Sequence, residues 1–312
     1  MIALIDADHL AVRNYYAHQH RTGFTGQPTG AIYGFLTSLR AICRQLQPQI
    51  LVVCWGDRRE NLWRRKILPS YKAKRSPPPE QYISQIQNLQ TLLQCLGLCQ
   101  VLCPTFEADD VIGAITADCI AADKEVGIIT GDHDLFQLIR EERPVVHCYV
   151  SVKKRGYQRV TSLEVKEKFG VSPELLPRFM ALRGENGDGV PGVPGVGPKR
   201  AAEYLRGEAT PRVAAKIKDN QRIVERNLNL VTLTKINSEN LTPSTLGVMP
   251  REYDEVRALA LLRKIGLTGV NSVLSEVRSM IGSYQEIQVN GAHSLSDILV
   301  EVENGGRADG KG

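Results

Sequence analysis

The chain has 312 residues, of which 42% are hydrophobic, and its formal net charge at pH 7 is +5. This length and composition predict a well-packed globular protein of one large or two smaller domains, and they exclude a disordered chain. The seven cysteines show no CxxC pairing, and the apolar run Ile2–Ile5 leads straight into an acid. We therefore expect a cytoplasmic protein with reduced cysteines packed in its core, and neither a signal peptide nor a membrane span.

Short apolar runs alternate with helical segments through the first half of the chain. The segment Gly30–Leu46 repeats apolar residues with a helical period and separates the first two runs. Such alternation predicts an α/β fold, in which a central, mostly parallel sheet is covered by helices on both faces. Ligands bind these sheets beyond the carboxyl ends of the strands. The expected strands are Ile2–Ile5, Ile50–Trp55, Leu98–Leu102, Glu125–Thr130 and Val145–Val150.

Acidic residues follow three of these strands, and three more crowd into the segment TFEADDVIGAI. An aspartate after a strand is also common in turns, and an acid before a helix also caps it. Neither explanation requires so many carboxylates at one edge, where they repel each other unless a proton or a metal ion lies between them. The acids therefore predict a site for hard divalent ions. They are Asp6, Asp57, Asp132 and Asp134 after strands, and Glu107, Asp109 and Asp110 before a helix.

The segment from residue 57 to residue 80 is dense in lysine and arginine and closes with three prolines. One interpretation is a solvated loop or helix. Its position beside the acidic edge favours a mobile cationic element, in which basic side chains bind phosphates and aromatic ones stack on bases. The residues expected to do so are Tyr71, Lys72, Lys74 and Arg75.

Helical patterns dominate the second half, where residues 182–205 (LRGENGDGVPGVPGVGPKRAAEYL) interrupt them with glycines and prolines. The turn before Pro198 is expected to open a helix whose free N–H groups can bind a phosphate. A plain surface turn is the alternative, but hairpin, glycines and a basic pair occur here together. Two further acids, Glu185 and Asp188, lie on the entry side. The expected DNA contacts are Gly192, Val193, Gly195, Gly197, Lys199 and Arg200, and the expected helices are Leu163–Phe169, Pro173–Leu182, Asn220–Thr234 and Tyr253–Ile265.

The order and spacing of these motifs resemble the 5′–3′ exonuclease and flap endonuclease family, which includes the nuclease domain of bacterial DNA polymerase I. The motifs are LIDADHLAVR, PTGAIYGF, FEADDVIG, TGDHDLFQL and GVPGVPGVGPKRA, and the resemblance covers residues 1 to about 265. It implies a PIN-like nuclease core at 1–160 with a helical arch at about 60–90. It also implies a helical DNA-binding domain at 161–290 with a helix–hairpin–helix (H3TH) unit at about 175–205, followed by a tail at 291–312 whose end is disordered.

The resemblance further implies a monomeric enzyme that hydrolyses phosphodiester bonds at 5′ ends, flaps, nicks and gaps in DNA, and at RNA–DNA hybrid ends, in primer removal and repair. Two Mg²⁺ or Mn²⁺ ions about 4 Å apart would activate water and stabilise the leaving oxygen. Arg64, Lys72 and Arg75 would steer the scissile phosphate while Tyr71 stacks on a base, and hairpin carbonyls would bind K⁺. The first ion would be held by Asp6, Asp57, Glu107, Asp109 and Asp110, and the second by Asp132, Asp134, Glu185 and Asp188.

The chain departs from the family pattern in the segment that contains Glu185 and Asp188. Family members usually have Gly-Asp-x-Ser-Asp-Asn there, whereas this chain has Glu185, Gly187 and Gly189. The longer Glu185 side chain changes the geometry expected at the second ion, and the glycines remove side chains beside the hairpin. The alternative function is therefore a protein that binds branched DNA with impaired catalysis. A single-strand ribonuclease is a third hypothesis, against which the duplex-binding hairpin argues.

Overall fold

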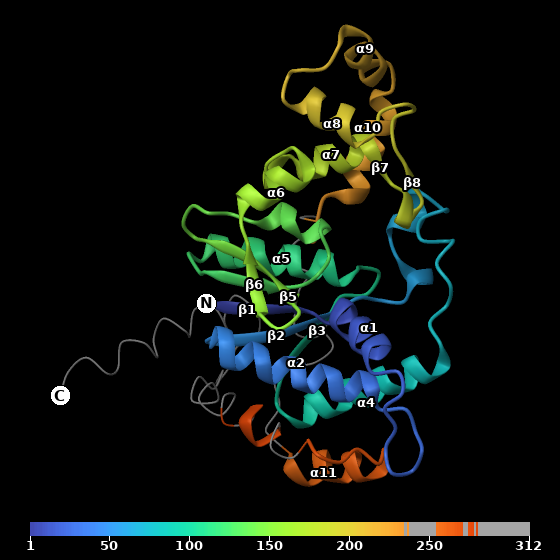
Figure 1. Ribbon diagram of the computed structural model, residues 1–312. Helices are drawn as coiled ribbons and strands as arrows, with labels where there is room; N and C mark the ends of the chain where they lie inside the picture. Colours follow the sequence, from blue (N-terminus) through green and yellow to red (C-terminus); the bar gives the residue numbers. More distant parts are fainter. Residues whose placement is uncertain (234–235, 237–253, 271–273, 278, 280–312) are drawn as a thin grey trace, which may run out of the picture.

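Six strands form the central sheet, in the order β3-β2-β1-β4-β5-β6 (Figure 1). The computed structural model describes residues 1–233, 236, 254–270, 274–277 and 279. Neighbouring strands are parallel except for β6, which runs antiparallel to β5, so the prediction of a mostly parallel sheet is confirmed. The strands are β1 (Ile2–Asp6), β2 (Ile50–Trp55), β3 (Cys99–Leu102), β4 (Val126–Ile129), β5 (Val146–Val152) and β6 (Gly156–Val160).

Helices cover both faces of the sheet, as the continuous apolar strands predict. Successive residues of a strand point to opposite faces, so Leu4 packs in the core cluster with α5 while Ile5 packs in the cluster with α2 and α4. Both residues are fully buried, which explains why the run is apolar throughout. The helices around the sheet are α1 (Ala7–Ala17), α2 (Gly30–Leu46), α4 (Glu80–Cys95) and α5 (Ala108–Ala121).

Strand β6 is the one strand of this sheet that the apolar runs do not predict. It pairs with β5 in a hairpin, and Gln158 and Arg159 in it are exposed. A strand at the edge of a sheet is wetted on one side, and polar residues there keep other chains from pairing with it. Its apolar signal is therefore limited to Tyr157 and Val160.

The second half of the chain begins as a stack of helices on one side of the sheet (Figure 1). The core cluster that contains Ile128 of β4 continues through Met180 of α7 to Val224 of α10, so the stack and that face of the sheet share one hydrophobic interior. The predicted helices are found with small shifts at their ends, and Thr234 lies outside the described residues. The stack consists of α6 (Ser162–Phe169), the 3₁₀ turn η3 (Pro173–Leu175), α7 (Leu176–Arg183), α8 (Pro198–Leu205), α9 (Pro211–Asp219) and α10 (Gln221–Val231).

Helix α11 (Glu255–Lys264) corrects the predicted domain boundary. It was expected to complete the helical domain at 161–290, but it packs against α4 at the opposite end of the molecule (Figure 1). Ala258 and Leu262 belong to the core cluster of α2 and α4. An apolar stripe shows that a helix is covered, but it does not show by which surface, so sequence order was a poor guide here. The tail expected at 291–312 lies outside the described residues.

The cysteines behave as core residues. All seven are free thiols, and only Cys99 is not fully buried. Burial raises the pKa of Cys148, which keeps it protonated. No helix in the described part of the chain combines the length and the hydropathy needed to cross a membrane.

Candidate active site

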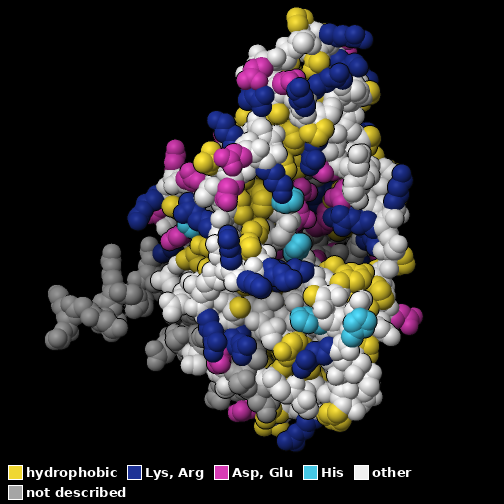
Figure 2. Space-filling model, viewed as in Figure 1, with side chains coloured by type: hydrophobic (Ala, Val, Ile, Leu, Met, Phe, Trp, Pro, Cys, Tyr) yellow, Lys and Arg dark blue, Asp and Glu magenta, His cyan; other side chains and the backbone are white. Residues whose placement is uncertain are grey.

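Acidic side chains from three separate segments meet at the carboxyl edge of the sheet. Burial raises the pKa of Asp109 well above its usual value, and the nearby charges of Asp6, Asp132 and Glu107 raise it further. These residues belong to the end of β1, the loop after β4 and the start of α5. Figure 2 shows acidic side chains gathered in a hollow of this face, with basic side chains at its rim. The predicted convergence at the sheet edge is therefore found for these four carboxylates.

A second group of acids joins the sheet edge to the start of the hairpin. Burial and then the charges of Asp132, Glu185 and Asp188 raise the pKa of Asp134 to about 7. Asp134 opens the 3₁₀ turn η2 (Asp134–Leu138). Glu185 lies in the two-residue strand β7 (Gly184–Glu185), and Asp188 lies in the turn η4 (Asn186–Asp188). Both lead into β8 (Val190–Pro191). Residues more than 50 positions apart thus share one electrostatic environment.

Backbone and hydroxyl groups fix the loop after β4 against the end of β1. Asp6 caps α1 by accepting a hydrogen bond from the His9 N–H (3.1 Å), and its other oxygen accepts one from Thr130 Oγ1 (2.7 Å). The same hydroxyl accepts from the Asp132 N–H (2.9 Å), and Asp132 Oδ1 accepts from the Asp134 N–H (3.0 Å). These hydrogen bonds hold the loop after β4 against the end of β1.

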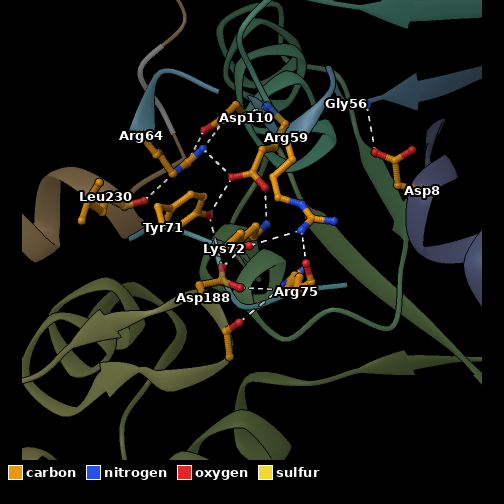
Figure 3. A network of polar contacts seen from close by, with 12 residues as sticks. Asp8, Gly56, Arg59, Arg64, Tyr71, Lys72, Arg75, Asp110, Asp188 and Leu230 are labelled. Atoms are coloured by element: carbon orange, nitrogen blue, oxygen red, sulfur yellow. Dashed lines mark hydrogen bonds and ion pairs between the residues drawn. The ribbon is translucent and has the colours of Figure 1, made fainter. Parts of the chain in front are cut away.

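The basic segment between β2 and α4 lies over these acids. Lys72 Nζ contacts Glu107 and is 3.7 Å from Asp188 Oδ2, and Arg75 also contacts Asp188 (Figure 3). The Lys72 N–H donates to the Asp188 carbonyl oxygen (2.7 Å), which ties the segment to η4. Burial alone would raise the pKa of Glu107, but the charges of Lys72 and Arg64 lower it. The segment therefore covers the acidic cluster, and it consists of η1 (Arg59–Asn61), α3 (Arg64–Ile67) and turns.

Tyr71 is placed differently from the prediction. Its side chain is only 4% exposed, and its hydroxyl donates to Glu107 Oε2 (2.7 Å) and Asp188 Oδ2 (3.2 Å). A ring buried in this way cannot stack on a base. The stacking expectation is corrected, because the acids that attract Lys72 also draw the neighbouring hydroxyl inward.

Arg64 and Asp110 form a buried pair rather than parts of an open site. The Arg64 side chain is 2% exposed, and it donates to both oxygens of Asp110 (2.5 and 2.6 Å) and to the Leu230 carbonyl oxygen (2.6 Å). Asp110 is fully buried and also accepts from the Glu107 N–H (3.1 Å). A phosphate cannot reach this guanidinium, and the carboxylate is already neutralised. Both expectations, a phosphate contact and a metal ligand, are therefore corrected: the pair joins α3 to α5 and α10.

The carboxylate of Asp57 is not part of the acidic cluster. The carboxylate of Asp8, which was not predicted from the sequence, lies near Asp6 and Glu107. One Asp57 oxygen accepts from the Thr105 N–H (2.8 Å), and the other accepts from the Arg58 N–H (2.6 Å) and Asn61 Nδ2 (3.1 Å). Burial, Asp6 and Glu107 raise the pKa of Asp8 to about 7. Its proximity to Asp6 in the motif LIDADHL is the signal that could have found it.

The cluster has the donor chemistry of a divalent-ion site, although its side chains are not arranged as a complete ligand set. Among the residues that the structure describes, no three His, Cys, Asp or Glu side chains converge to coordinate one ion. Instead Lys72 and Arg75 contact oxygens of Glu107 and Asp188. The donors are all carboxylates, whose mutual repulsion a hard cation would relieve, so the residues fit Mg²⁺ or Mn²⁺.

The predicted hairpin is present between α7 and α8. The Val193 N–H donates to the Leu182 carbonyl oxygen (2.9 Å), the Val196 N–H donates to that of Val193 (2.9 Å), and both valines are buried. Gly195 has a φ of 74°, which favours glycine. Helix α8 then begins with Pro198, as expected.

Two basic side chains beside this hairpin differ in their exposure and in their hydrogen bonds. The Lys199 side chain is 91% exposed, whereas Arg200 donates to the Gly195 carbonyl oxygen (2.6 Å). This carbonyl oxygen, one of those in the hairpin that were expected to bind K⁺, therefore already accepts a hydrogen bond. Gly189 has a φ of 72°, and a Cβ there would lie 2.7 Å from the Ser70 carbonyl oxygen. This departure from the expected pattern thus lets the basic segment pack against the hairpin.

Comparisons with known proteins give one family match and several similar sequences. Residues 1–170 match the family described as 5′-3′ exonuclease, N-terminal resolvase-like domain. The chain is 37% identical over 204 residues to the thermostable DNA polymerase I of Thermus filiformis, covering 65% of this chain and 23% of the relative. It is 32% identical over 272 residues to the DNA polymerase I of Mycobacterium bovis, covering 83% of this chain and 30% of the relative. The chain thus spans less than a third of the length of these relatives.

Solved structures share the fold at low sequence identity. The T5 D15 protein co-crystallised with metal ions superposes with a TM-score of 0.62 at 16% identity, covering 91% of this chain and 99% of that one. A complex of the T5 D15 flap endonuclease with DNA and metal ions gives 0.60 at 16% identity, with the same coverage. Flap endonuclease-1 of Methanococcus jannaschii gives 0.59 at 15% identity, covering 91% and 93%. These likenesses extend the match from residues 1–170 to most of the chain.

Proposed function

The chain belongs to the 5′-3′ exonuclease family, and from this membership we propose that it is a metal-dependent 5′ nuclease that cuts DNA at 5′ ends, flaps, nicks and gaps. The observation that carries the proposal is the gathering of Asp6, Asp109, Asp132 and Asp134 at one sheet edge under a basic segment. The T5 D15 structures with DNA and metal ions support it as an analogy of fold.

Two groups of carboxylates would hold the divalent ions. Bound there, such ions polarise a phosphodiester and lower the pKa of a coordinated water. Asp57 is left out because backbone donors engage both of its oxygens, and Asp110 is left out because it is fully buried and Arg64 donates to both of its oxygens. Glu107 also contacts Arg64 (3.0 Å) and Lys72, but it is kept because its side chain is 14% exposed. The first group is Asp6, Glu107 and Asp109, and the second is Asp132, Asp134, Glu185 and Asp188.

The basic segment would orient the DNA phosphates. Lys72 and Arg75 already contact Glu107 and Asp188, so a phosphate that enters beside these acids meets both cations. Lys74 is exposed on the same segment and would contact the strand outside the site. The hairpin at Gly192–Gly197 would hold the duplex through backbone N–H groups, with Lys199 adding a phosphate contact.

A 5′-labelled flap substrate tests the proposal directly. We expect labelled products to be released in Mg²⁺ or Mn²⁺, and the flap to be bound without cleavage in Ca²⁺. Comparing flap, nicked, gapped and single-stranded DNA under the same conditions measures the preference for 5′ structures. Absence of products with every divalent ion would overturn the nuclease proposal.

One contact favours the second candidate, a branched-DNA-binding protein with impaired catalysis. Arg183 contacts Glu185, and although burial raises the pKa of Glu185, the charge of Arg183 opposes the shift. If this pair persists on DNA, the second group loses a carboxylate. Tight flap binding in Ca²⁺ with no turnover in Mg²⁺ would identify this function.

Mg²⁺ should raise the thermal stability more at about pH 8 than at about pH 5. The pKa values of Asp8 and Asp134 rise from 3.8 to about 7 in the folded protein, so the unfolded chain releases these protons at lower pH than the folded protein does. The stability of the metal-free protein therefore falls as the pH increases between these two pKa values. At the lower pH, protons also compete with the ion for the same oxygens. Unfolding temperatures measured with MgCl₂, and with KCl at matched ionic strength, check this. An equal Mg²⁺ effect at both pH values would contradict it.

Lys199→Ala should weaken duplex binding and remove about one phosphate contact from its salt dependence. The Lys199 side chain is 91% exposed beside the hairpin, so its loss leaves the fold unchanged. Fluorescence anisotropy with a nicked duplex over a range of KCl concentrations measures the slope. Lys153→Ala, an exposed lysine in the turn between β5 and β6, is the matched control. Identical slopes for the two variants would exclude Lys199 as a phosphate contact.

A further inference from the structure

Gly56 follows the carboxyl end of β2, and a Cβ on it would lie 3.3 Å from the Cα atom of Glu107. A Cβ on Gly56 would lie 2.7 Å from Asp8 Oδ2 and 3.0 Å from the Ala108 nitrogen. A contact of 2.7 Å is essentially never made by a real Cβ atom, so the Asp8 carboxyl group, the free end of a side chain, would have to move aside. The carboxylate of Asp8 therefore occupies space that a side chain on residue 56 would need.

Asp8 does not act as the cap of its own helix. Asp6 has that role, since its carboxylate accepts from the His9 N–H. Asp8 instead accepts from the Gly56 N–H (2.9 Å), a residue 48 positions away (Figure 3). Within the described part of the chain, no group donates a hydrogen bond to its second oxygen, Oδ1. One oxygen is thus anchored to the end of β2, and the other is available to a ligand.

Asp57, the residue next to Gly56, is occupied elsewhere. Its carboxylate holds the loop after β3 through the Thr105 N–H and its own turn through Asn61. The carboxylate that faces the cluster at this end of β2 therefore comes from α1. An added carboxylate increases the negative charge of an oxygen-ligand site and so its affinity for a divalent cation.

We propose that Asp8 contributes a carboxylate to the divalent-ion site of Asp6, Glu107 and Asp109, and that Gly56 leaves the room in which this carboxylate is held. The inference rests on the proposed function, since it concerns the same ion. Asp8 supplies the charge, and Gly56 supplies the space for the Asp8 carboxylate and an N–H that donates to it.

Mn²⁺ binding without DNA, followed by electron paramagnetic resonance of the free ion, tests the inference apart from activity. Asp8→Asn keeps an acceptor for the Gly56 N–H but removes the charge, and we expect Mn²⁺ affinity to fall by at least about 10-fold. Gly56→Ala should weaken binding in the same direction by displacing the carboxylate. The double variant should bind no more weakly than Asp8→Asn, because both changes act on one group.

Asp123→Asn is the control, because this exposed aspartate precedes β4 at the opposite edge of the sheet. Thermal unfolding without metal shows whether each variant folds. Wild-type Mn²⁺ affinity in a folded Asp8→Asn variant would overturn the role of Asp8 while leaving the proposed nuclease intact. Additive losses from Asp8→Asn and Gly56→Ala would overturn the role of Gly56. If the wild type itself binds no Mn²⁺, the metal centre of the proposed function fails, and Asp8 with it.

Discussion

Asp134→Asn should reduce cleavage of a 5′ flap by more than about 100-fold, because even residues that only orient metal ligands are worth about 10–100-fold. Asp134 lies among Asp132, Glu185 and Asp188, and these charges and burial raise its pKa to about 7. Removing its charge relieves repulsion in the metal-free protein, so the free energy of unfolding should stay the same or rise. Flap binding in Ca²⁺ should change only a few-fold, since the hairpin and the basic segment are untouched.

Single-turnover cleavage in Mg²⁺ measures the first effect, and urea unfolding measures the second. Asp123→Asn is again the matched control: this residue has a φ of 55°, which asparagine tolerates, and it lies away from the cluster. A fully active Asp134→Asn variant would show that the acids between β4 and the hairpin do not take part in catalysis.

Arg64→Met should destabilise the protein by about 3–5 kcal/mol, the usual cost of leaving one partner of a buried ion pair alone. Arg64 is 2% exposed and Asp110 is fully buried, so water cannot replace the lost contacts. Burial alone would lower the pKa of Arg64, but the charge and hydrogen bonds of Asp110 raise it, which shows how strongly the pair favours the charged form. The midpoint of urea unfolding in metal-free buffer reports the loss.

A double-mutant cycle separates this pair from general disruption of α3. Asp110→Asn keeps an acceptor for the Glu107 N–H but removes the charge, so Arg64→Met should cost much less in that background. Arg65→Met, the next residue of α3, should have little effect, because it is not fully buried. The same loss in both backgrounds would mean that Arg64 stabilises the fold through its packing and its bonds to Leu230 and Glu107 rather than through Asp110.

The acidic edge was predictable from the sequence because it depends on strand direction. Parallel strands end at one edge, so Asp6, Asp132 and Asp134 had to lie near each other once their strands were recognised. The helix at Gly30–Leu46 and the hairpin before Pro198 were equally predictable, since helical periodicity and Gly/Pro placement are local properties. Family motifs added the order of these parts.

Contacts between distant segments decided which of the candidate side chains face the acidic cluster. Arg64 reaches Leu230, 166 positions away, and so becomes a buried structural residue. The same kind of contact packs α11 on α4. Spacing along a chain shows where a residue lies in the sheet, but the direction of its side chain depends on donors, charges and free volume brought by other segments. For this reason the sequence by itself determined the fold and the edge at which the acids gather, while only the tertiary structure placed Asp8 against Gly56 and turned Asp57 toward the Thr105 backbone.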